Sequence, residues 1–370
     1  EKHEKKASSL SPLQKELNIL TKQIALIAFS IGLIFFLIAV FLVQDPWMES
    51  FLFALGMIVA FIPEGLLPAV TLSLALAVQK MAKEHALVKK LSAVETLGCT
   101  NVICSDKTGT LTQNEMTVNH LWSLRAELTV SGEGYAPSGE IRDGNTVVTA
   151  KNSSALNLLL SGAALCSNAK LIPPDEGKER YTVLGDPTEA CLNVVAQKGG
   201  IDVEALNQTY PRIMELPFDS RRKRMTTIHQ LRETFEGSNR IAFVKGAPKE
   251  VMELCQRCYD GSSSRPMKEE DRRRIMQAND TYAKDGLRVL AVAYRSLRRD
   301  DESLPVSIRE YSPENIETNL TFLGLVAMQD PPRSEVKEAV RLCRSAGIKI
   351  IMITGDYGLT AESIARKIGI

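Results

Sequence analysis

Two long stretches of apolar residues lie near the start of the chain. Residues 23–44 contain no charged side chain, and residues 50–79 contain only Glu64. Each stretch exceeds the roughly 20 apolar residues that a helix needs to cross a bilayer. A buried core helix does not explain two such stretches joined by a short turn, and a signal peptide is shorter and followed by a cleavage site. The pattern predicts a pair of transmembrane helices.

The flanking charges predict the orientation of this helix pair. Lysines precede the first stretch and follow the second, whereas residues 45–49 between them contain no Lys or Arg. Positively charged flanks stay on the cytoplasmic side of a membrane. We therefore expect a multi-pass integral membrane protein with both ends of this chain in the cytoplasm.

The rest of the chain alternates between strand and helix patterns. An apolar strand at residues 101–105 ends at Asp106, and a mixed α/β region follows. Within it we expect strands at residues 146–152 and 240–248 and helices at residues 154–169 and 187–199. From residue 320 the pattern is strand, helix, strand and helix, and the second of these strands leads into Thr354, Gly355 and Asp356.

Composition excludes some classes of protein. The 45 basic and 44 acidic side chains nearly balance, so no global charge favours nucleic acid. Seven cysteines at irregular spacing are typical of reduced cytosolic thiols rather than of a disulfide scaffold. Cys255 and Cys258 have CxxC spacing without a second pair, which favours two helix-borne thiols over a zinc or redox site.

Asp106 is the strongest candidate for chemistry. An aspartate at the end of a strand can simply cap the next turn. A carboxylate can also attack a phosphoryl group, provided that Mg²⁺ and hydrogen-bond donors neutralise the phosphoryl oxygens. Thr108 supplies a hydroxyl, and the Thr354–Asp356 motif supplies further groups if the two strand ends meet at one edge of a parallel sheet.

Glu64 is the second candidate. A carboxylate in hydrocarbon costs about 2.5–3.5 kcal/mol on insertion scales and marks a functional site by default. Pro63 and Gly65 flank it, so we expect an interrupted helix whose free carbonyls lie near the carboxylate. The alternative is a protonated Glu64 that hydrogen-bonds to a neighbouring helix.

Several motifs, in order, resemble those of the P-type cation-transporting ATPases. They are CSDKTGTLT around Asp106, IPEGL around Glu64, KGAP at Lys245, QDPPR at Asp330 and TGD at Thr354. The resemblance implies that ATP phosphorylates Asp106, and that the Asp106 carboxylate and the Thr108 carbonyl bind Mg²⁺. It also implies a parallel α/β phosphorylation domain of the haloacid-dehalogenase type. Related phosphatases have an acid where this chain has Thr108, so the phosphoenzyme should be long-lived.

The resemblance also implies a nucleotide site. Phe218 would stack on adenine, and Lys245 would line the pocket. The full set of implied nucleotide-binding residues is Thr108, Glu189, Phe218, Lys245, Arg288, Thr354, Gly355 and Asp356. Ser220 departs from the family, because close relatives often have a phosphate-contacting arginine there; Arg221 or Arg222 would have to replace it.

By the same resemblance, Glu64 and the carbonyls of Val59, Ala60 and Ile62 bind the transported ion. Parts of the sequence look like bacterial calcium pumps and others like sodium/potassium pumps. We expect Ca²⁺, with a monovalent cation pump as the alternative, in a bacterial or archaeal plasma membrane.

The resemblance implies five segments, and it covers nearly the whole chain. They are a cytoplasmic lead-in helix in 1–22, the transmembrane pair in 23–80, the phosphorylation domain in 81–118 and 327–370, and an inserted nucleotide-binding domain in 119–326. The family's actuator domain and later membrane helices would lie outside this sequence. On its own the segment is expected to bind ATP weakly and not to pump. Two other classes remain: a membrane-tethered nucleotide-binding module without turnover, and an anchored phosphatase, which Thr108 and Glu64 disfavour.

Overall fold

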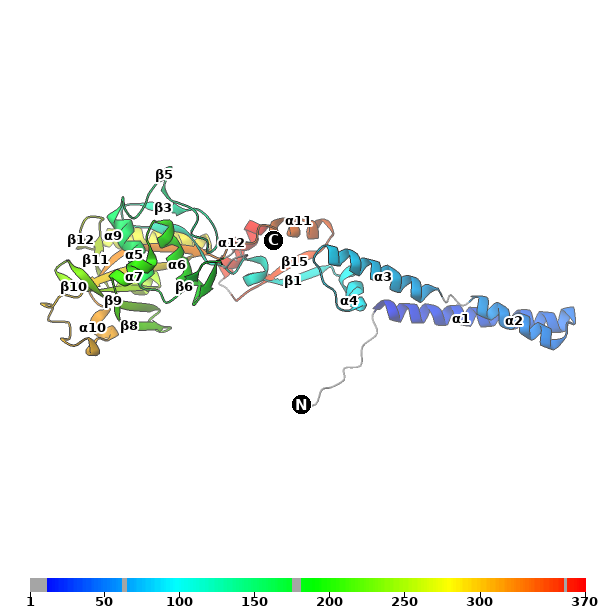
Figure 1. The fold of residues 1–370 in the computed structure, drawn as a ribbon. Coiled ribbons are helices and arrows are strands. Elements are labelled where there is room, and N and C mark those ends of the chain that lie inside the picture. Colours follow the sequence, from blue (N-terminus) through cyan, green and yellow to red (C-terminus); the bar gives the residue numbers. More distant parts are fainter. Residues whose placement is uncertain (1–11, 62–64, 175–180, 356–357) are drawn as a thin grey trace. The chain divides into compact units, whose positions relative to one another are not determined.

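The computed structural model describes residues 12–61, 65–174, 181–355 and 358–370. They form two compact units, Glu1–Val102 and Ile103–Ile370, which are drawn in Figure 1. The predicted site residues Ile62, Glu64 and Asp356 lie outside the described residues. The structure therefore places the remaining predicted residues only.

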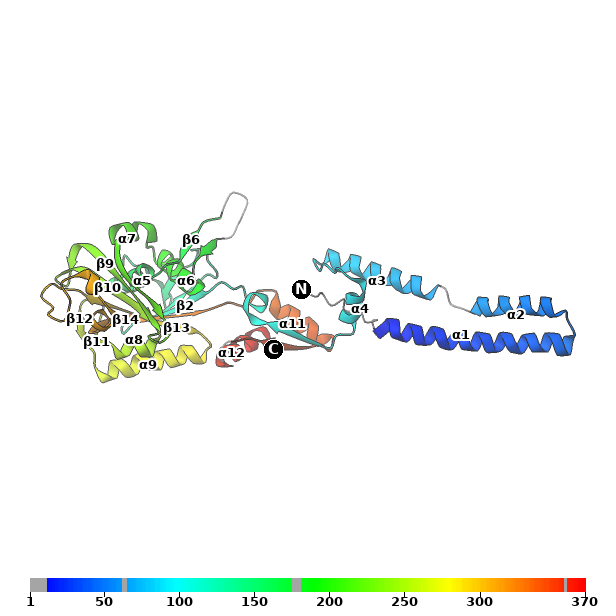
Figure 2. The ribbon, with the colours of Figure 1, turned by 90° about the horizontal axis from the view of Figure 1, so that it is seen from below.

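The first unit is helical. It contains α1 (Pro12–Ile38), which continues into a π-helical turn (Ala39–Val43), and α2 (Trp47–Phe61), α3 (Leu66–Lys83) and α4 (Leu91–Gly98). Helices α1 and α2 lie side by side (Figure 2). Gly32 permits their close approach, because a Cβ atom there would lie 2.5 Å from Ile58 Cγ1. Phe36 and Phe51 add an edge-to-face contact with ring centroids 6.4 Å apart.

Most apolar side chains of these two helices are exposed. Phe29 in α1 and Phe53 in α2 are 57% and 58% exposed, and exposed aromatic side chains in such number are unusual for a surface in contact with water. One helical stretch among the described residues, Lys15–Val43, is long and apolar enough to cross a bilayer. The second predicted transmembrane stretch is divided between α2, which ends at Phe61, and α3, which begins at Leu66.

The second unit is built on a large, mostly antiparallel sheet. Its main strand order is β5-β4-β3-β2-β14-β13-β10-β9-β8, and β11 pairs with both β14 and β12. The strands are β2 (Thr117–Trp122), β3 (Glu127–Val130), β4 (Ile141–Asp143), β5 (Thr146–Val147), β8 (Arg212–Asp219), β9 (Arg224–Phe235), β10 (Ser238–Gly246), β11 (Cys255–Tyr259), β12 (Ser264–Pro266), β13 (Arg288–Ser296) and β14 (Leu320–Gln329). In this sheet β11 and β14 run parallel. The central strand β14 is buried along all but its last residue.

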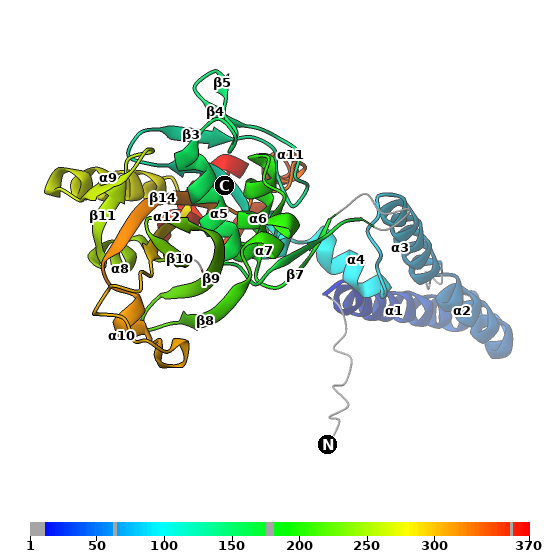
Figure 3. The same ribbon diagram turned by 60° about the vertical axis from the view of Figure 1, so that its left-hand side comes forward.

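Helices cover both faces of this sheet. One face packs against α5 (Ser154–Leu165), α6 (Pro187–Lys198) and α7 (Val203–Thr209), which are grouped together in Figure 3. The other face packs against α8 (Pro248–Glu253) and α9 (Glu269–Lys284). A smaller cluster near α10 (Pro313–Ile316) closes the end of the sheet next to β8. The strand pair β6 (Lys170–Ile172) and β7 (Thr182–Leu184) lies outside the large sheet.

A separate two-stranded sheet joins β1 (Val102–Asp106) to β15 (Lys349–Ile353). Helices α11 (Val336–Ser345) and α12 (Gly358–Ile368) pack together with Leu111, which follows β1. The predicted order of strand, helix, strand and helix after residue 320 is confirmed. The first of these strands, β14, belongs to the large antiparallel sheet and not to the sheet that contains β1.

Candidate functional site

Asp106 is the last residue of β1, and its side chain is exposed. One carboxylate oxygen, Oδ1, accepts a hydrogen bond of 3.3 Å from the backbone N–H of Thr108. The chain then turns through Gly109, whose φ of +76° lies in the left-handed region that favours glycine. The turn therefore leaves most of the Asp106 carboxylate accessible to a ligand.

The second predicted motif follows the neighbouring strand. Because β15 ends at Ile353 and pairs with β1, Thr354 and Gly355 continue from a strand that is hydrogen-bonded to the strand of Asp106. The sequence predicted this pairing across more than half of the chain. Gly355 is exposed and Thr354 is half-buried.

The residues around Asp106 fit a magnesium ion that is shared with a phosphate. Mg²⁺ usually keeps several waters and takes one or two carboxylates together with substrate phosphates. The Asp106 carboxylate is accessible, and Thr108 lies exposed in the adjoining turn. In the part of the chain that the structure describes, no three His, Cys, Asp or Glu side chains gather as a metal site.

The turn after Asp106 is held by the segment around Asp330. The backbone N–H of Gln113 donates to Pro331 O, and the N–H of Arg333 donates to Leu111 O, both at 3.0 Å. The Arg333 guanidinium donates to Gly109 O at 3.0 Å. Sequence reasoning quoted the QDPPR motif but assigned no role to these residues. The motif itself was visible in the sequence, but nothing in it indicated which residues it would contact.

In the nucleotide-site prediction, Glu189 and Lys245 are in direct contact. Lys245 Nζ lies 2.7 Å from Glu189 Oε1, and both side chains are largely buried. Glu189 Oε2 also accepts a hydrogen bond of 2.6 Å from the backbone N–H of Asn168. Removing one partner of such a buried ion pair leaves the other charge uncompensated, which is strongly destabilising.

Arg288 lies next to this pair through Thr188. Its Nη1 donates to Thr188 Oγ1 at 3.1 Å. Thr188 precedes Glu189 in the first turn of α6, where Asp186 caps the helix by accepting from the Thr188 backbone N–H at 2.7 Å. The structure thus brings three of the four predicted nucleotide residues of the large-sheet region together.

Phe218 lies at the same end of the sheet as the Lys245–Glu189 pair, two strands away from Lys245. It precedes Asp219, which is the register partner of Arg224 on β9. Arg224 is in turn the partner of Gly246, which follows Lys245 on β10. Two strand spacings of roughly 4.8 Å separate β8 from β10. The Phe218 ring is 62% exposed, so it is accessible for stacking.

The two arginines after Ser220 have different roles. The Arg222 guanidinium bonds to Glu317 and, through Nη2, to Pro217 O at 2.7 Å. Arg221 contributes its backbone amide to the turn and leaves its side chain exposed. Arg222 is therefore committed to contacts within the protein.

The prediction that Cys255 and Cys258 lie on a helix is wrong. Both lie on β11, and both are fully buried. A register irregularity between Cys255 and Arg257 in the pairing with β14 allows two positions three residues apart to face the core. Burial raises the pKa of the Cys255 thiol to about 12 and also raises the pKa of Cys258. The sequence showed no alternation here from which the strand could be recognised.

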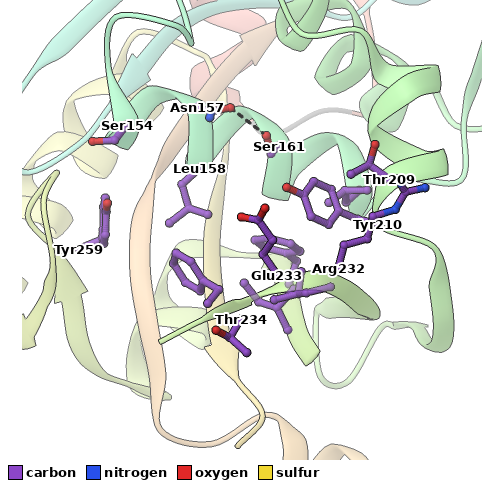
Figure 4. Close-up of a pocket in the computed structure, with 15 residues that line it drawn as sticks. Ser154, Asn157, Leu158, Ser161, Thr209, Tyr210, Arg232, Glu233, Thr234 and Tyr259 are labelled. Atoms are coloured by element: carbon purple, nitrogen blue, oxygen red, sulfur yellow. Dashed lines mark hydrogen bonds between the residues drawn. The ribbon is translucent and has the colours of Figure 1, made fainter. Parts of the chain in front are cut away.

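A cavity of about 490 Å³ lies between α5 and the outer parts of β9 and β10 (Figure 4). Its lining includes Asn157 and Ser161, which share a hydrogen bond of 3.2 Å, and Tyr210, Arg232 and Glu233. None of the predicted nucleotide residues lines it. The cavity is therefore separate from the ion pair of Lys245.

Of the predicted ion ligands, Val59 and Ala60 lie in the last turn of α2. Pro63 has no backbone N–H, so the Val59 carbonyl has no hydrogen-bond donor four residues further along the chain. Ile62 and Glu64 belong to the residues that the structure does not describe.

Comparison with known proteins identifies the family. A family model for the cytoplasmic N domain of P-type ATPases matches residues 155–335. A calcium-transporting ATPase of Bacillus subtilis is 39% identical over 98% of this chain, and the match covers 39% of that protein. Calcium-transporting ATPase type 2C member 1 of Bos taurus is 39% identical over 97% of this chain and is covered to 35%. Potassium-transporting ATPase alpha chain 2 of Homo sapiens is 36% identical over 97% of this chain and is covered to 34%.

The chain belongs to the P-type cation-transporting ATPase family. It spans about two fifths or less of the length of these relatives.

Proposed function

We propose that this chain is the part of an ATP-driven cation pump in which ATP phosphorylates Asp106. One observation carries the proposal: β1, which ends in Asp106, pairs with β15, which leads into Thr354 and Gly355, in a member of the P-type ATPase family. Strand ends are where open α/β sheets bind ligands. The proposed phosphorylation domain is of the haloacid-dehalogenase type and comprises residues 81–118 and 327–370.

In this mechanism the Asp106 carboxylate attacks the γ-phosphorus of ATP. A bond forms between a carboxylate oxygen and phosphorus, the bond to the bridging oxygen breaks, and ADP leaves. Asp106 and the Thr108 carbonyl would hold Mg²⁺, which supplies charge neutralisation when bound. The Thr108 hydroxyl and the Thr354 and Gly355 groups donate to phosphoryl oxygens, and Asp356 belongs to the same proposed site.

Thr108 also governs the lifetime of the phosphoenzyme. A carboxylic acid at this position could act as general acid or base for hydrolysis, but a threonine hydroxyl cannot do so effectively. The acyl phosphate therefore persists long enough to be coupled to a conformational change. An anchored phosphatase without transport is correspondingly disfavoured.

The nucleotide is delivered by an inserted domain, residues 119–326. The exposed Phe218 ring is proposed to stack on adenine, and base–aromatic stacking contributes about 1–3 kcal/mol. Lys245 and Arg288 provide positive charge near the nucleotide, and Glu189 orients Lys245 through their contact of 2.7 Å.

The helical unit is proposed to provide two membrane spans within residues 23–80, with both flanks in the cytoplasm of a plasma membrane. Support comes from the length of Lys15–Val43 and from the exposed apolar side chains of α1 and α2. Glu64 and the carbonyls of Val59, Ala60 and Ile62 would bind the ion, because Pro63 cannot donate a hydrogen bond to the Val59 carbonyl.

We propose Ca²⁺ as the transported ion. The matches to calcium-transporting relatives in a bacterium and in cattle support this choice. A monovalent cation pump is the second candidate, and the match to a human potassium-transporting relative supports it. Because the relatives include both calcium- and potassium-transporting proteins, the transported ion is decided by the experiment below.

The ion is tested in membranes that contain the complete pump. Phosphorylation by ATP should depend on micromolar Ca²⁺ and be abolished by EGTA, whereas Na⁺ alone should not stimulate it. Glu64→Gln should raise the Ca²⁺ concentration for half-maximal labelling by roughly tenfold or more, because the charge count of the ligands sets affinity. Glu49→Gln, in the first turn of α2, is the matched control. Labelling that follows Na⁺ and ignores Ca²⁺ would select the second candidate.

A further inference from the structure

A buried carboxylate, Glu317, is bonded to the turn at residues 220–223, which follows Phe218 and the end of β8. Glu317 is 1% exposed and accepts hydrogen bonds from three side chains of the turn and of β9. Arg224 Nε donates to Glu317 Oε2 at 2.6 Å, and the Thr226 hydroxyl donates to Oε1 at 2.8 Å. The third donor is Arg222 Nη1. A buried carboxylate with this many donors is fixed in place.

Arg222 connects Glu317 to the backbone next to Phe218. While Nη1 bonds to Glu317, Nη2 of the same guanidinium donates to Pro217 O at 2.7 Å. That carbonyl belongs to the peptide bond that joins Pro217 to Phe218. The planar fork of one guanidinium thus links the buried carboxylate to the backbone at Phe218.

The other side of the same turn is closed by Asp219. Its Oδ1 accepts the backbone N–H groups of Arg221 and Arg222, both at 2.9 Å. The hydrogen bonds from these two amides, with the larger effect coming from Arg222, hold the pKa of Asp219 below its ordinary value. The backbone on both sides of Phe218 is therefore held by hydrogen bonds, while the Phe218 side chain stays exposed.

We propose that Arg222 and Glu317 are positioning residues for Phe218, and that they preset its exposed ring for the adenine base. The inference rests on the proposed role of Phe218 in nucleotide binding. An aromatic ring on a mobile segment loses more conformational entropy when it binds a base than a ring whose backbone is already held in place. Arg222 acts through the Phe218 backbone and does not itself contact the triphosphate.

The test compares Arg222→Lys with Arg221→Lys in the purified full-length protein. A lysine at position 222 keeps a positive charge beside Glu317, but its compact ammonium cannot replace the fork that also reaches Pro217 O. Affinities for adenosine, AMP and ATP are measured by calorimetric titration, and urea unfolding checks that each variant is folded.

We expect Arg222→Lys to weaken adenosine, AMP and ATP by the same factor, roughly tenfold, because all three share the adenine that stacks. Arg221→Lys should leave adenosine affinity unchanged. Glu317→Gln should act in the same direction as Arg222→Lys. Combining Phe218→Ala with Arg222→Lys should add little to the loss from Phe218→Ala alone, because the two residues act through one contact.

The outcomes separate the two proposals. If Phe218→Ala leaves adenosine affinity unchanged, the proposed adenine site is wrong. If Phe218→Ala weakens adenosine but Arg222→Lys and Glu317→Gln do not, only the positioning role is overturned. A loss confined to ATP in Arg222→Lys would also overturn it, because that pattern marks a phosphate contact.

Discussion

The hydroxyl of Thr112 donates a hydrogen bond of 2.5 Å to Oδ2 of Asp330, across 218 residues of sequence. Both side chains are buried. Asp330 Oδ1 accepts a second hydrogen bond, of 3.2 Å, from the backbone N–H of Glu115. The chain leaves the Asp106 turn at Thr112 and returns at Asp330, so this contact ties together the two segments that lead into β2 and out of β14.

Removing the Thr112 hydroxyl should destabilise the protein. Thr112→Val keeps the shape of the side chain but leaves a buried carboxylate oxygen without this donor, which costs about 1–3 kcal/mol. Urea unfolding should show the loss as a lower midpoint with an unchanged slope. Thr281→Val is the control, because the exposed Thr281 hydroxyl bonds only to Gln277 O in its own helix. Equal midpoints for Thr112→Val and Thr281→Val would contradict the importance of this contact.

The buried pair Lys245–Glu189 should be strongly coupled. Lys245→Met removes one partner and leaves the Glu189 carboxylate largely buried, at 16% side-chain exposure, so a loss of about 3 kcal/mol is expected. The double variant Lys245→Met with Glu189→Gln should recover part of that loss, because no buried charge is then unpaired.

A double-mutant cycle of unfolding free energies checks this coupling. Lys151→Ala, an exposed lysine in a turn, should have almost no effect and serves as control. Strictly additive effects of the two substitutions at positions 189 and 245 would show that the pair does not interact energetically.

His229 should make the large-sheet unit sensitive to acid. Burial lowers the pKa of His229 from 6.5 to about 4. Nδ1 lies 2.9 Å from Tyr210 O, and Nε2 lies 2.9 Å from Thr227 Oγ1. Above pH 6.5 the ring is neutral in both the folded and the unfolded state. As the pH falls below 6.5 the unfolded state gains a proton first, so folding stability is lost down to about pH 4.

The expected loss between pH 7 and pH 5 is on the order of 2 kcal/mol for this group. Unfolding free energies of the wild type and of His229→Asn, measured at both pH values, isolate it. His85→Asn, at an exposed position, is the control. A wild type and a His229→Asn protein with the same pH dependence would rule out this residue as the cause.

Six of the seven cysteines should fall into two classes of reactivity. Cys99 and Cys104 are exposed, whereas Cys166, Cys191, Cys255 and Cys258 are buried. Burial raises the pKa of Cys191 and of Cys255 to about 12, so their reactive thiolate form is scarce at neutral pH. Iodoacetamide followed by mass spectrometry should modify the first class in the folded protein and the second only in urea. Rapid modification of Cys255 without urea, or a melting temperature lowered by EDTA, would contradict two buried metal-free thiols.

Some of this structure could be predicted from local patterns. Helix α6 follows from Asp186 as cap, Pro187 at the first helical position and a run of apolar residues after Glu189. The pairing of β1 with β15 could be predicted because both strands lead into polar motifs, and ligands of open parallel sheets bind at the strand ends. The predicted strand at residues 146–152 is reduced to β5, Thr146–Val147, because its edge position gives few partners.

Other features depended on contacts between distant residues. The arrangement of Glu317, Arg222 and Pro217 joins residues almost 100 positions apart, and no spacing in the sequence indicates it. The strand position of Cys255 and Cys258 depends on an irregular register with β14, which periodicity does not reveal. The antiparallel character of the large sheet likewise follows from the order in which strands pair, and not from the pattern of any one strand.

The central claim is that the carboxylate of Asp106 receives the phosphoryl group of ATP. The most direct measurement is acid-stable incorporation of ³²P from [γ-³²P]ATP into membranes that contain the complete pump, for the wild type, Asp106→Asn and the exposed control Asp143→Asn. We predict label in the wild type and in Asp143→Asn that hydroxylamine removes, and no label in Asp106→Asn. Label that persists in Asp106→Asn would contradict the account.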